Sequence, residues 1–183
     1  MQVFAFTGQI SSGKTTQLNR VKDFLLSQQK TVKTFFADDV AKTAYSQEPE
    51  ASQLSKVLSG HQKTDIFVDI GLRKLVESII HPFVYSRLKE IISEASFDYL
   101  LVEVPILKPE RVRYFDKIFY LTADFDTRKK LALQRGMTED QFIQRDEVLS
   151  SKPKVSSDKL VVISDSIDFD ITKLLSKEIP ENK

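Results

Sequence analysis

The segment GQISSGKT, from Gly8 to Thr15, constrains the fold of this chain more than any other part of it. It matches G-x-x-x-x-G-K-[ST], the pattern of the phosphate-binding P-loop. An apolar, β-prone run at 2–7 precedes it, and a run with helical periodicity at 16–29 follows it. A match placed between a strand and a helix is far more specific than the string alone, because a P-loop joins those two elements. The sequence therefore predicts a site for a polyphosphate with its metal ion.

The glycines and serines of the loop suit this task. Gly8 and Gly13 allow positive φ angles and a close approach of the backbone to phosphate oxygens. We expect the amides of residues 10–15, including those of Ser11 and Ser12, to point inward as an anion-binding nest. The following helix adds the positive end of its dipole.

Three side chains complete the predicted polyphosphate site. Lys14 should reach the β- and γ-phosphates as a point charge. The Thr15 hydroxyl should ligate Mg²⁺, and Thr16 beside it should contact phosphate oxygens. The alternative is a serine- and glycine-rich turn with an ordinary surface lysine, which the strand and helix on either side disfavour.

Composition limits the other classes of function. The 183 residues fit one domain, 1–183, and the net charge of +1 gives no reason to expect binding to nucleic acid or to an acidic membrane. There is no cysteine, which excludes disulfides and thiolate chemistry, and the two histidines, His61 and His81, do not make a metal cluster. With no apolar run of membrane-spanning length and no signal peptide, a cytoplasmic protein is the simplest expectation.

Strand and helix patterns alternate along the chain, which predicts an α/β domain with a five-stranded parallel sheet. The expected strands are 2–7, 31–37, 99–104, 117–122 and 160–163. The third is apolar almost throughout, as a central parallel strand should be.

The expected helices include a short one at 40–45, capped by Asp39. Pro82 predicts a boundary between helices at 66–80 and 83–94, because proline suits a first helical turn and disfavours helix at the residue before it. Further helices are expected at 52–58, from 124 to 135, and at 168–175, while 136–157 reads as a polar, charged segment.

Ligands of open α/β sheets sit at the carboxyl ends of the strands. Asp38 follows the second expected strand and is a candidate general base for an attacking hydroxyl; the alternative is a plain strand exit or helix cap. Glu103 lies near the end of the third strand, where a buried carboxylate needs a cation, a metal-bound water or hydrogen-bond donors. It is a candidate Mg²⁺ ligand, directly or through water, and the alternative is pairing with a nearby lysine or arginine.

Three arginines surround the charged segment: Arg128, Arg135 and Arg145. A lid that closes over phosphates would use such residues to exclude water and neutralise charge, and Arg135, directly before a glycine, is the strongest candidate. The alternative is a solvated helix face. For His81 and Pro82, the residues alone favour a helix end or a core histidine.

Several segments together resemble the dephospho-coenzyme A kinase family. The family's TGGIGSGK[ST], D-A-D-x-I-A-R, leucine-rich helix into H-P-L, D-V-P-L-L-F-E and R-x-G-[LM]-[ST]-E-E have counterparts, in order, in TGQISSGKT, FADDVAK, LVESIIHPF, EVPILKP and RGMTEDQ. The resemblance covers nearly the whole chain.

The resemblance implies ATP-dependent phosphorylation of the ribose 3′-hydroxyl of dephospho-coenzyme A, with Mg²⁺ as cofactor. It also implies a three-layer P-loop kinase fold with helices on both faces of the sheet, a helical substrate-binding part at 46–95 and a lid at 135–157. Asp38 matches the family's catalytic aspartate. The expected catalytic residues are therefore Asp38, Lys14 and Arg135. The substrate pocket would also include His81, Pro82, Glu103 and Pro105. A monomer or small homo-oligomer is expected, with no nucleic acid or membrane partner.

Some positions depart from the family pattern. Phe36 stands at its first aspartate, Lys42 at its closing arginine and Lys108 at its phenylalanine. Two alternatives therefore remain: another small-molecule kinase acting on a nucleoside, nucleotide or metabolite, and a nucleotide-binding regulator of the same fold. GTPases and transporter ATPases are disfavoured, because D-x-x-G, N-K-x-D and L-S-G-G-Q are missing.

Overall fold

The computed structural model describes residues 1–62, 65–66, 69–149 and 157–177. The chain divides into two compact units. One, here called the sheet unit, comprises Met1–Phe35 and Ser96–Lys183; the other, the helical unit, comprises Phe36–Ala95. The predicted substrate-binding part at 46–95 falls within the helical unit, and part of the predicted lid, at 150–156, lies outside the described residues.

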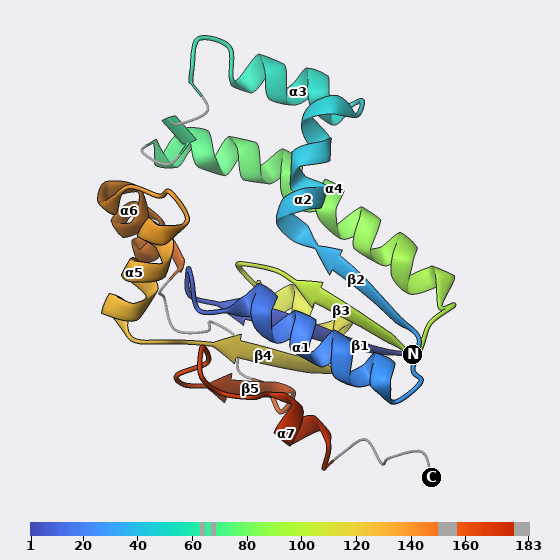
Figure 1. Cartoon of the computed structure of the whole chain (residues 1–183). Coiled ribbons are helices and arrows are strands. Elements are labelled where there is room, and N and C mark those ends of the chain that lie inside the picture. The colour runs from blue at the N-terminus through green and yellow to red at the C-terminus, as the bar shows by residue number, and fades with distance from the viewer. Residues whose placement is uncertain (63–64, 67–68, 150–156, 178–183) are drawn as a thin grey trace. The chain divides into compact units, whose positions relative to one another are not determined.

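A five-stranded sheet in the order β2-β3-β1-β4-β5 organises the sheet unit (Figure 1). The strands are β1 (Gln2–Gly8), β2 (Val32–Phe36), β3 (Tyr99–Glu103), β4 (Lys117–Leu121) and β5 (Leu160–Ile163). The pairs β1–β3, β1–β4 and β4–β5 are parallel, and Phe6 lies opposite Glu103 on one side and Phe119 on the other. The predicted α/β fold with a five-stranded parallel sheet is confirmed.

Aromatic side chains fill the core around the central strand β1. Phe4 meets the rings of Tyr99 and Phe119 edge to face, at centroid distances of 5.5 and 5.9 Å. Phe6 and Phe119 are fully buried. Burial of such side chains removes a large apolar area from water.

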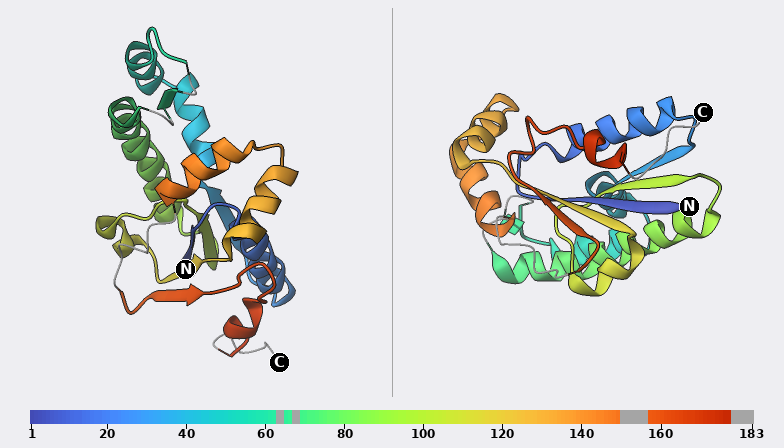
Figure 2. Two further views of the ribbon diagram at one scale, coloured as in Figure 1. Left: turned by 90° about the vertical axis from the view of Figure 1, so that its left-hand side faces the viewer. Right: turned by 90° about the horizontal axis from the view of Figure 1, so that it is seen from below.

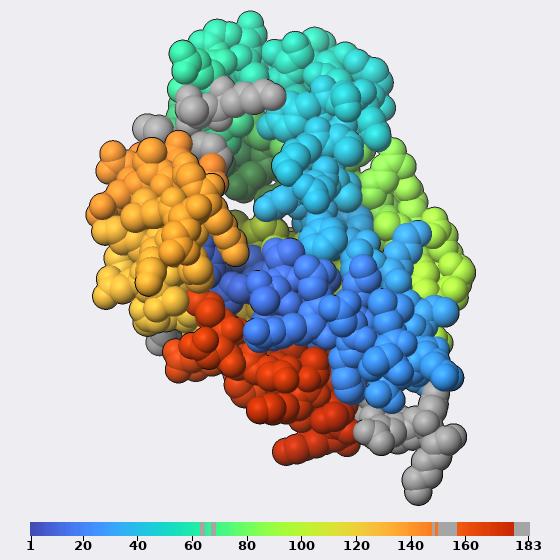
Figure 3. All heavy atoms as spheres, viewed as in Figure 1, coloured from blue at the N-terminus to red at the C-terminus, as the bar shows by residue number. Residues whose placement is uncertain are grey.

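Helix α1 (Lys14–Ser27) leaves the P-loop directly and buries Leu18, Val21 and Leu25 on one face. It lies beside the short helix α7 (Thr172–Leu175) on the same face of the sheet (Figures 2 and 3). The described residues of the unit also form the 3₁₀ helix η3 (Pro109–Tyr114), α5 (Phe125–Gln134) and α6 (Glu139–Leu149). Asp124 caps α5 by accepting a hydrogen bond from the Thr127 amide, in the place where the sequence predicted the start of that helix.

The helical unit contains α2 (Ala37–Thr43), the 3₁₀ helix η1 (Ala44–Ser46), α3 (Glu50–Val57) and α4 (Ile70–Glu94). Helices α2 and α3 both pack on α4. The side chains buried in this unit include Leu54, Leu72, Val76, Phe83 and Leu88.

Two predictions about this unit are wrong. Pro82 does not separate two helices but lies inside the continuous helix α4. A proline in this position costs the helix one hydrogen bond to the carbonyl four residues earlier, and buried residues on both sides of it, Val76 and Phe83, Val84 and Leu88, hold the two halves on the same core. Nor does Asp39 cap a helix, because α2 starts at Ala37 and Phe36 holds the cap position.

Helix α6 lies in the segment that the sequence presented only as polar and charged. Among the side chains of α6 whose burial is described, Phe142 is the one apolar side chain that is fully buried, so the periodic apolar signal is weak. Among the described residues, none of the helices combines the length and the apolarity that crossing a bilayer requires.

Candidate active site

The P-loop adopts a backbone that demands glycine at two places. Gly8 has φ 132°, and a Cβ on it would lie 2.1 Å from the carbonyl oxygen of Leu121, a contact the backbone cannot relieve. Gly13 has φ 81°. Ser11 also takes a left-handed φ of 54°, which costs a residue with a Cβ about 1–2 kcal/mol. The glycines at two of the three positions with positive φ were thus predicted, and at the third Ser11 carries strain that a glycine would not.

The predicted phosphate-binding lysine folds back over this loop. The Nζ of Lys14 donates to the carbonyl oxygens of Gln9 at 2.7 Å and Gly8 at 3.3 Å. Lys14 is also the first residue of α1, so its charge adds to the positive end of that helix. The loop therefore presents a partly exposed ammonium beside backbone amides, an arrangement suited to a polyphosphate.

Two predicted metal ligands meet across 88 residues of sequence. The Thr15 hydroxyl donates to Oε2 of Glu103 over 2.8 Å. Glu103 is the last residue of β3 and lies opposite Phe6 of β1, two residues before the P-loop begins at Gly8. Parallel pairing of β1 with β3 thus brings the carboxylate to the loop, as the position at a strand's carboxyl end predicted.

The donors at this point fit Mg²⁺. Mg²⁺ prefers oxygen ligands and is usually held by one or two protein groups together with phosphate oxygens and waters. A hydroxyl and a carboxylate, both oxygen donors, meet that requirement. Within the described residues no group of three or more His, Cys, Asp or Glu side chains is placed to hold a metal on its own, so a nucleotide would have to contribute to the coordination.

Hydrogen bonds that the sequence did not predict join the segment after β5 to the P-loop and to α1. The Nε2 of the fully buried Gln17 donates to the carbonyls of Ser166 and Phe169, each at 2.5 Å. The Ser166 hydroxyl lies 2.6 Å from the carbonyl oxygen of Ser12 and 2.8 Å from that of Thr122. The one signal in the sequence was the glutamine itself, which lies on the face of α1 that otherwise buries Leu18 and Val21. A buried amide needs hydrogen-bond partners, so its position indicated polar contacts there.

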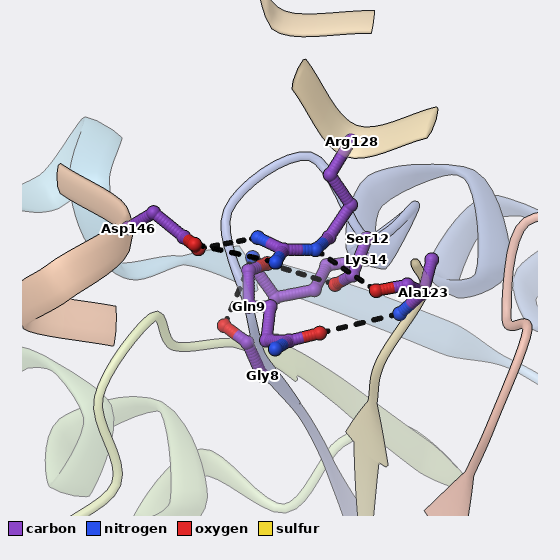
Figure 4. Close-up of polar contacts among 7 residues, drawn as sticks. All are labelled: Gly8, Gln9, Ser12, Lys14, Ala123, Arg128 and Asp146. Atoms are coloured by element: carbon purple, nitrogen blue, oxygen red, sulfur yellow. Dashed lines mark hydrogen bonds and ion pairs between the residues drawn. The ribbon is translucent and has the colours of Figure 1, made fainter. Parts of the chain in front are cut away.

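The three arginines proposed for the lid have different surroundings. Arg128 of α5 is buried and bidentate to Asp146 of α6, while its Nε donates to the carbonyl of Ala123 (Figure 4). Arg135 is exposed at the C-terminal end of α5, and Arg145 is half-buried in α6. Arg128 thus has a structural partner that its sequence neighbours do not reveal, and the role of Arg135 stays a prediction.

The predicted acceptor residues belong to both units. In the sheet unit, the carbonyl of Pro105 accepts a 3.2 Å hydrogen bond from the Thr7 hydroxyl. In the helical unit, Asp38 is exposed in the first turn of α2, and in α4 His81 is half-buried and Pro82 is exposed.

Lys42 pairs with Asp39 rather than with Asp38. Its Nζ lies 2.7 Å from Oδ1 of Asp39. The pKa of Lys42 is raised, first by that hydrogen bond and by the charge of Asp39, and less by the charge of Asp38. The negative charge of Asp39 is therefore compensated within α2.

The chain is similar to known proteins over nearly its full length. A family model described as dephospho-CoA kinase matches residues 2–167. The dephospho-CoA kinase of Gamma-proteobacterium EBAC31A08 is 26% identical over 187 residues, covering 93% of this chain and 92% of that protein. That of Hydrogenovibrio crunogenus is 25% identical over 161 residues, covering 79% of each.

Solved structures share the fold. The crystal structure of the protein TT1252 from Thermus thermophilus superposes with a TM-score of 0.69 at 17% identity, over 98% of both chains. An unliganded sugar kinase from Janibacter gives a TM-score of 0.55 at 15% identity, over 97% of this chain and 92% of that one. At these identities the likeness establishes the fold alone. The family model, in contrast, spans most of the chain and includes the P-loop, Glu103 and α5–α6, and the protein therefore belongs to the dephospho-CoA kinase family.

Proposed function

We propose that the protein transfers the γ-phosphoryl group of ATP to the ribose 3′-hydroxyl of dephospho-coenzyme A, giving coenzyme A and ADP. The bond from the 3′-oxygen to phosphorus forms, the bond from phosphorus to the β-phosphate oxygen breaks, and the hydroxyl proton leaves. The observation that carries the proposal is the match of the family model over residues 2–167, supported by the contact between Thr15 and Glu103 at the P-loop.

The P-loop supplies the donor half of this reaction. Amides of residues 10–15, including those of Ser11, Ser12 and Gly13, hold the phosphates, Gly8 lets the backbone come close to them, and Thr16 adds a hydroxyl. Lys14, held beside the loop by the carbonyls of Gln9 and Gly8 at 2.7 and 3.3 Å, neutralises charge on the β- and γ-phosphates.

Thr15 and Glu103 are the residues that would hold Mg²⁺. Bound there, the ion would neutralise charge on the β- and γ-phosphate oxygens. The Thr15 hydroxyl is already oriented by Glu103, which keeps its lone pairs available on the other side.

The acceptor half depends on Asp38. Its exposed carboxylate accepts the proton from the 3′-hydroxyl or orients that hydroxyl, and the compensation of Asp39 by Lys42 leaves the two neighbouring carboxylates in different surroundings. His81, Pro82, Glu103 and Pro105 belong to the pocket for dephospho-coenzyme A.

A lid at 135–157 closes over the phosphates and excludes water, with Arg135 as its phosphate-contacting residue. In this assignment 46–95 binds the acceptor, and 1–183 acts as one kinase domain. The protein works in the cytoplasm as a monomer or small homo-oligomer, with ATP and dephospho-coenzyme A as its ligands and without nucleic acid or membrane partners.

An acceptor panel tests the proposal. The protein is incubated with Mg-ATP and either dephospho-coenzyme A, nucleosides, nucleotides or simple sugars, and ADP release is measured for each. Release should be at least about 100-fold faster with dephospho-coenzyme A, because a site that hydrogen-bonds its acceptor strongly rejects compounds lacking the matching groups. Faster release with another acceptor identifies a different kinase, and ATP binding without release for any acceptor indicates a nucleotide-binding regulator.

A further inference from the structure

A continuous chain of contacts runs from the P-loop lysine to helix α6 (Figure 4). Lys14 Nζ donates to the main-chain oxygen of Gln9 at 2.7 Å. The side-chain Oε1 of Gln9 accepts from the amide of Ala123 at 3.3 Å, and the carbonyl of Ala123 accepts from Arg128 Nε at 2.9 Å. Arg128 then forms two bonds to the carboxylate of Asp146. Gln9 is the residue through which the phosphate-binding loop joins this chain.

The outer end of this chain of contacts is buried. Arg128 is 3% exposed and Asp146 8%. The guanidinium lies 5.8 Å from the ring centroids of both Phe125 and Phe142. The two aromatic faces and the carboxylate of Asp146 therefore fix its position. Salt screens an ion pair with so little access to water only weakly. Removal of one partner is strongly destabilising, because it leaves the other as an uncompensated buried charge. Helices α5 and α6 are therefore held in one arrangement through Arg128.

An apolar contact runs parallel to the polar chain. Ile10, the next residue of the P-loop, packs in a buried cluster with Ala132 of α5 and Phe142 of α6, with Met137 partly buried against it. Two consecutive loop residues are thus linked to the α5–α6 pair, Gln9 indirectly through the main chain of Ala123, which precedes α5, and Ile10 by direct packing. A displacement of α5 or α6 is therefore transmitted to the phosphate-binding loop.

We propose that Gln9 is a positioning residue that couples the α5–α6 pair to the phosphate-binding loop. With Asp146 holding Arg128, Ala123 is fixed and its amide holds the Gln9 side chain. The main-chain oxygen of Gln9 in turn fixes the position of the Lys14 ammonium before the nucleotide binds. Gln9 touches neither the metal nor the acceptor in this account, and it acts through Lys14. The proposal rests on the assignment of the P-loop as the ATP site.

Binding of Mg-ADP, measured by titration calorimetry, tests this coupling without an acceptor. Failure of the protein to phosphorylate dephospho-coenzyme A would therefore leave the result interpretable. Gln9→Met keeps the length of the side chain and removes the acceptor oxygen. It should weaken Mg-ADP binding about 3- to 10-fold, the effect of losing one neutral hydrogen bond. Unchanged affinity in the folded variant overturns the proposal.

A double-mutant cycle tests whether Gln9 and Asp146 act together. Asp146→Asn should also weaken Mg-ADP binding, and the double variant should bind within about 2-fold of the weaker single variant, because both changes break the same chain. Multiplication of the two single effects would overturn the coupling.

Lys129→Met is the matched control. It removes the ion pair between Lys129 and Glu139, which also joins α5 to α6 but is separate from the contacts of Gln9. This variant should bind Mg-ADP as the parent protein does, within about 2-fold, and its effect should multiply with that of Gln9→Met. A loss of affinity equal to that of Asp146→Asn would contradict a specific route through Gln9.

Amide hydrogen exchange covers the case in which Asp146→Asn does not fold. In Gln9→Met, the amide of Ala123 should exchange faster than in the parent protein, because its acceptor is gone. The amide of Thr127, which donates to Asp124 at 2.8 Å, should be unaffected. Unchanged protection of Ala123 overturns the proposal.

Discussion

The hydroxyl of Thr15 and the carboxylate of Glu103 are joined by a 2.8 Å hydrogen bond. One residue follows the P-loop lysine and the other ends β3. Because β1, which leads into the P-loop, and β3 run parallel and pair in a fixed register, the two residues of the proposed metal site are brought together by the sheet unit.

Replacing Glu103 by glutamine should change the dependence of the rate on Mg²⁺. The amide keeps the size of the side chain and an oxygen that can accept from Thr15, but it loses the negative charge. The free Mg²⁺ concentration that gives half the maximal rate should rise about 10- to 100-fold. Initial rates against free Mg²⁺ measure this, with Glu110→Gln, an exposed change in η3, as the control; equal Mg²⁺ dependence of both variants would refute the assignment.

Removal of the Lys14 ammonium should reduce the maximal rate. Lys14→Ala removes a charge placed against the loop that holds the phosphates, and such a loss costs about 10²- to 10³-fold in kcat. Lys14→Arg should restore little, because a planar fork does not replace a point charge. Steady-state kinetics on both variants and on Lys130→Ala, an exposed lysine of α5, test this; near-normal kcat in Lys14→Ala would contradict it.

Ser11→Gly should stabilise the protein. Ser11 has φ 54°, which glycine adopts without strain, so the strain relieved slightly exceeds the added flexibility of the unfolded chain, and the net gain is about 0.5 kcal/mol. Ser12→Ala is the contrasting change, because the buried Ser12 hydroxyl donates to Gln9 at 2.8 Å, and its loss should cost about 1 kcal/mol. Urea denaturation measures both, and a destabilised Ser11→Gly would be inconsistent with strain at this residue.

Two ion pairs between α5 and α6 should differ strongly in their contribution to stability. Asp146→Ala leaves Arg128 buried without its partner and should lower the free energy of unfolding by about 3–5 kcal/mol. Lys129→Ala removes a partly exposed pair and should cost less than about 1 kcal/mol. Equal effects in chemical denaturation would show that burial does not govern the difference.

The capping carboxylate of Asp124 should make stability depend on acid pH. Hydrogen bonds from the side chain and the backbone amide of Thr127 lower the pKa of Asp124. A lowered folded-state pKa adds stability that is complete above the unfolded value, about 3.9, and is lost as the pH falls through the folded value. Asp124→Asn keeps a good cap without the titration, so any advantage of the parent protein at pH 7 should shrink below about pH 4. A constant difference from pH 7 to pH 3 would contradict this.

The sequence predicted the parts of the structure that depend on local patterns. The strand at Leu160–Ile163 has the expected bounds, and the P-loop has its glycines at the positions that need positive φ. Glu103 was expected near the P-loop because the carboxyl ends of parallel strands share an edge, and its bond to Thr15 places it there; its role at the metal stays a prediction.

Contacts between distant segments could not be predicted. Arg128 and Asp146 are 18 residues apart, in two helices that are both rich in charge, so nothing local marks them as a buried pair. Pro82 misled for the opposite reason: its local preference for a helix start was overridden by apolar residues on both sides that pack on the same core. The Gln9 side chain was overlooked because its partner, Ala123, contributes only backbone atoms.

Identification of the phosphorylated hydroxyl tests the proposed function most directly. The protein is given Mg-ATP with dephospho-coenzyme A, with its 2′-deoxy analogue and with its 3′-deoxy analogue, and the products are analysed by mass spectrometry and phosphorus NMR. Transfer to the 3′-oxygen predicts one added phosphate on the first two compounds and none on the 3′-deoxy analogue. Phosphorylation of the 3′-deoxy analogue, or of none of the three while ATP binds, would contradict the account.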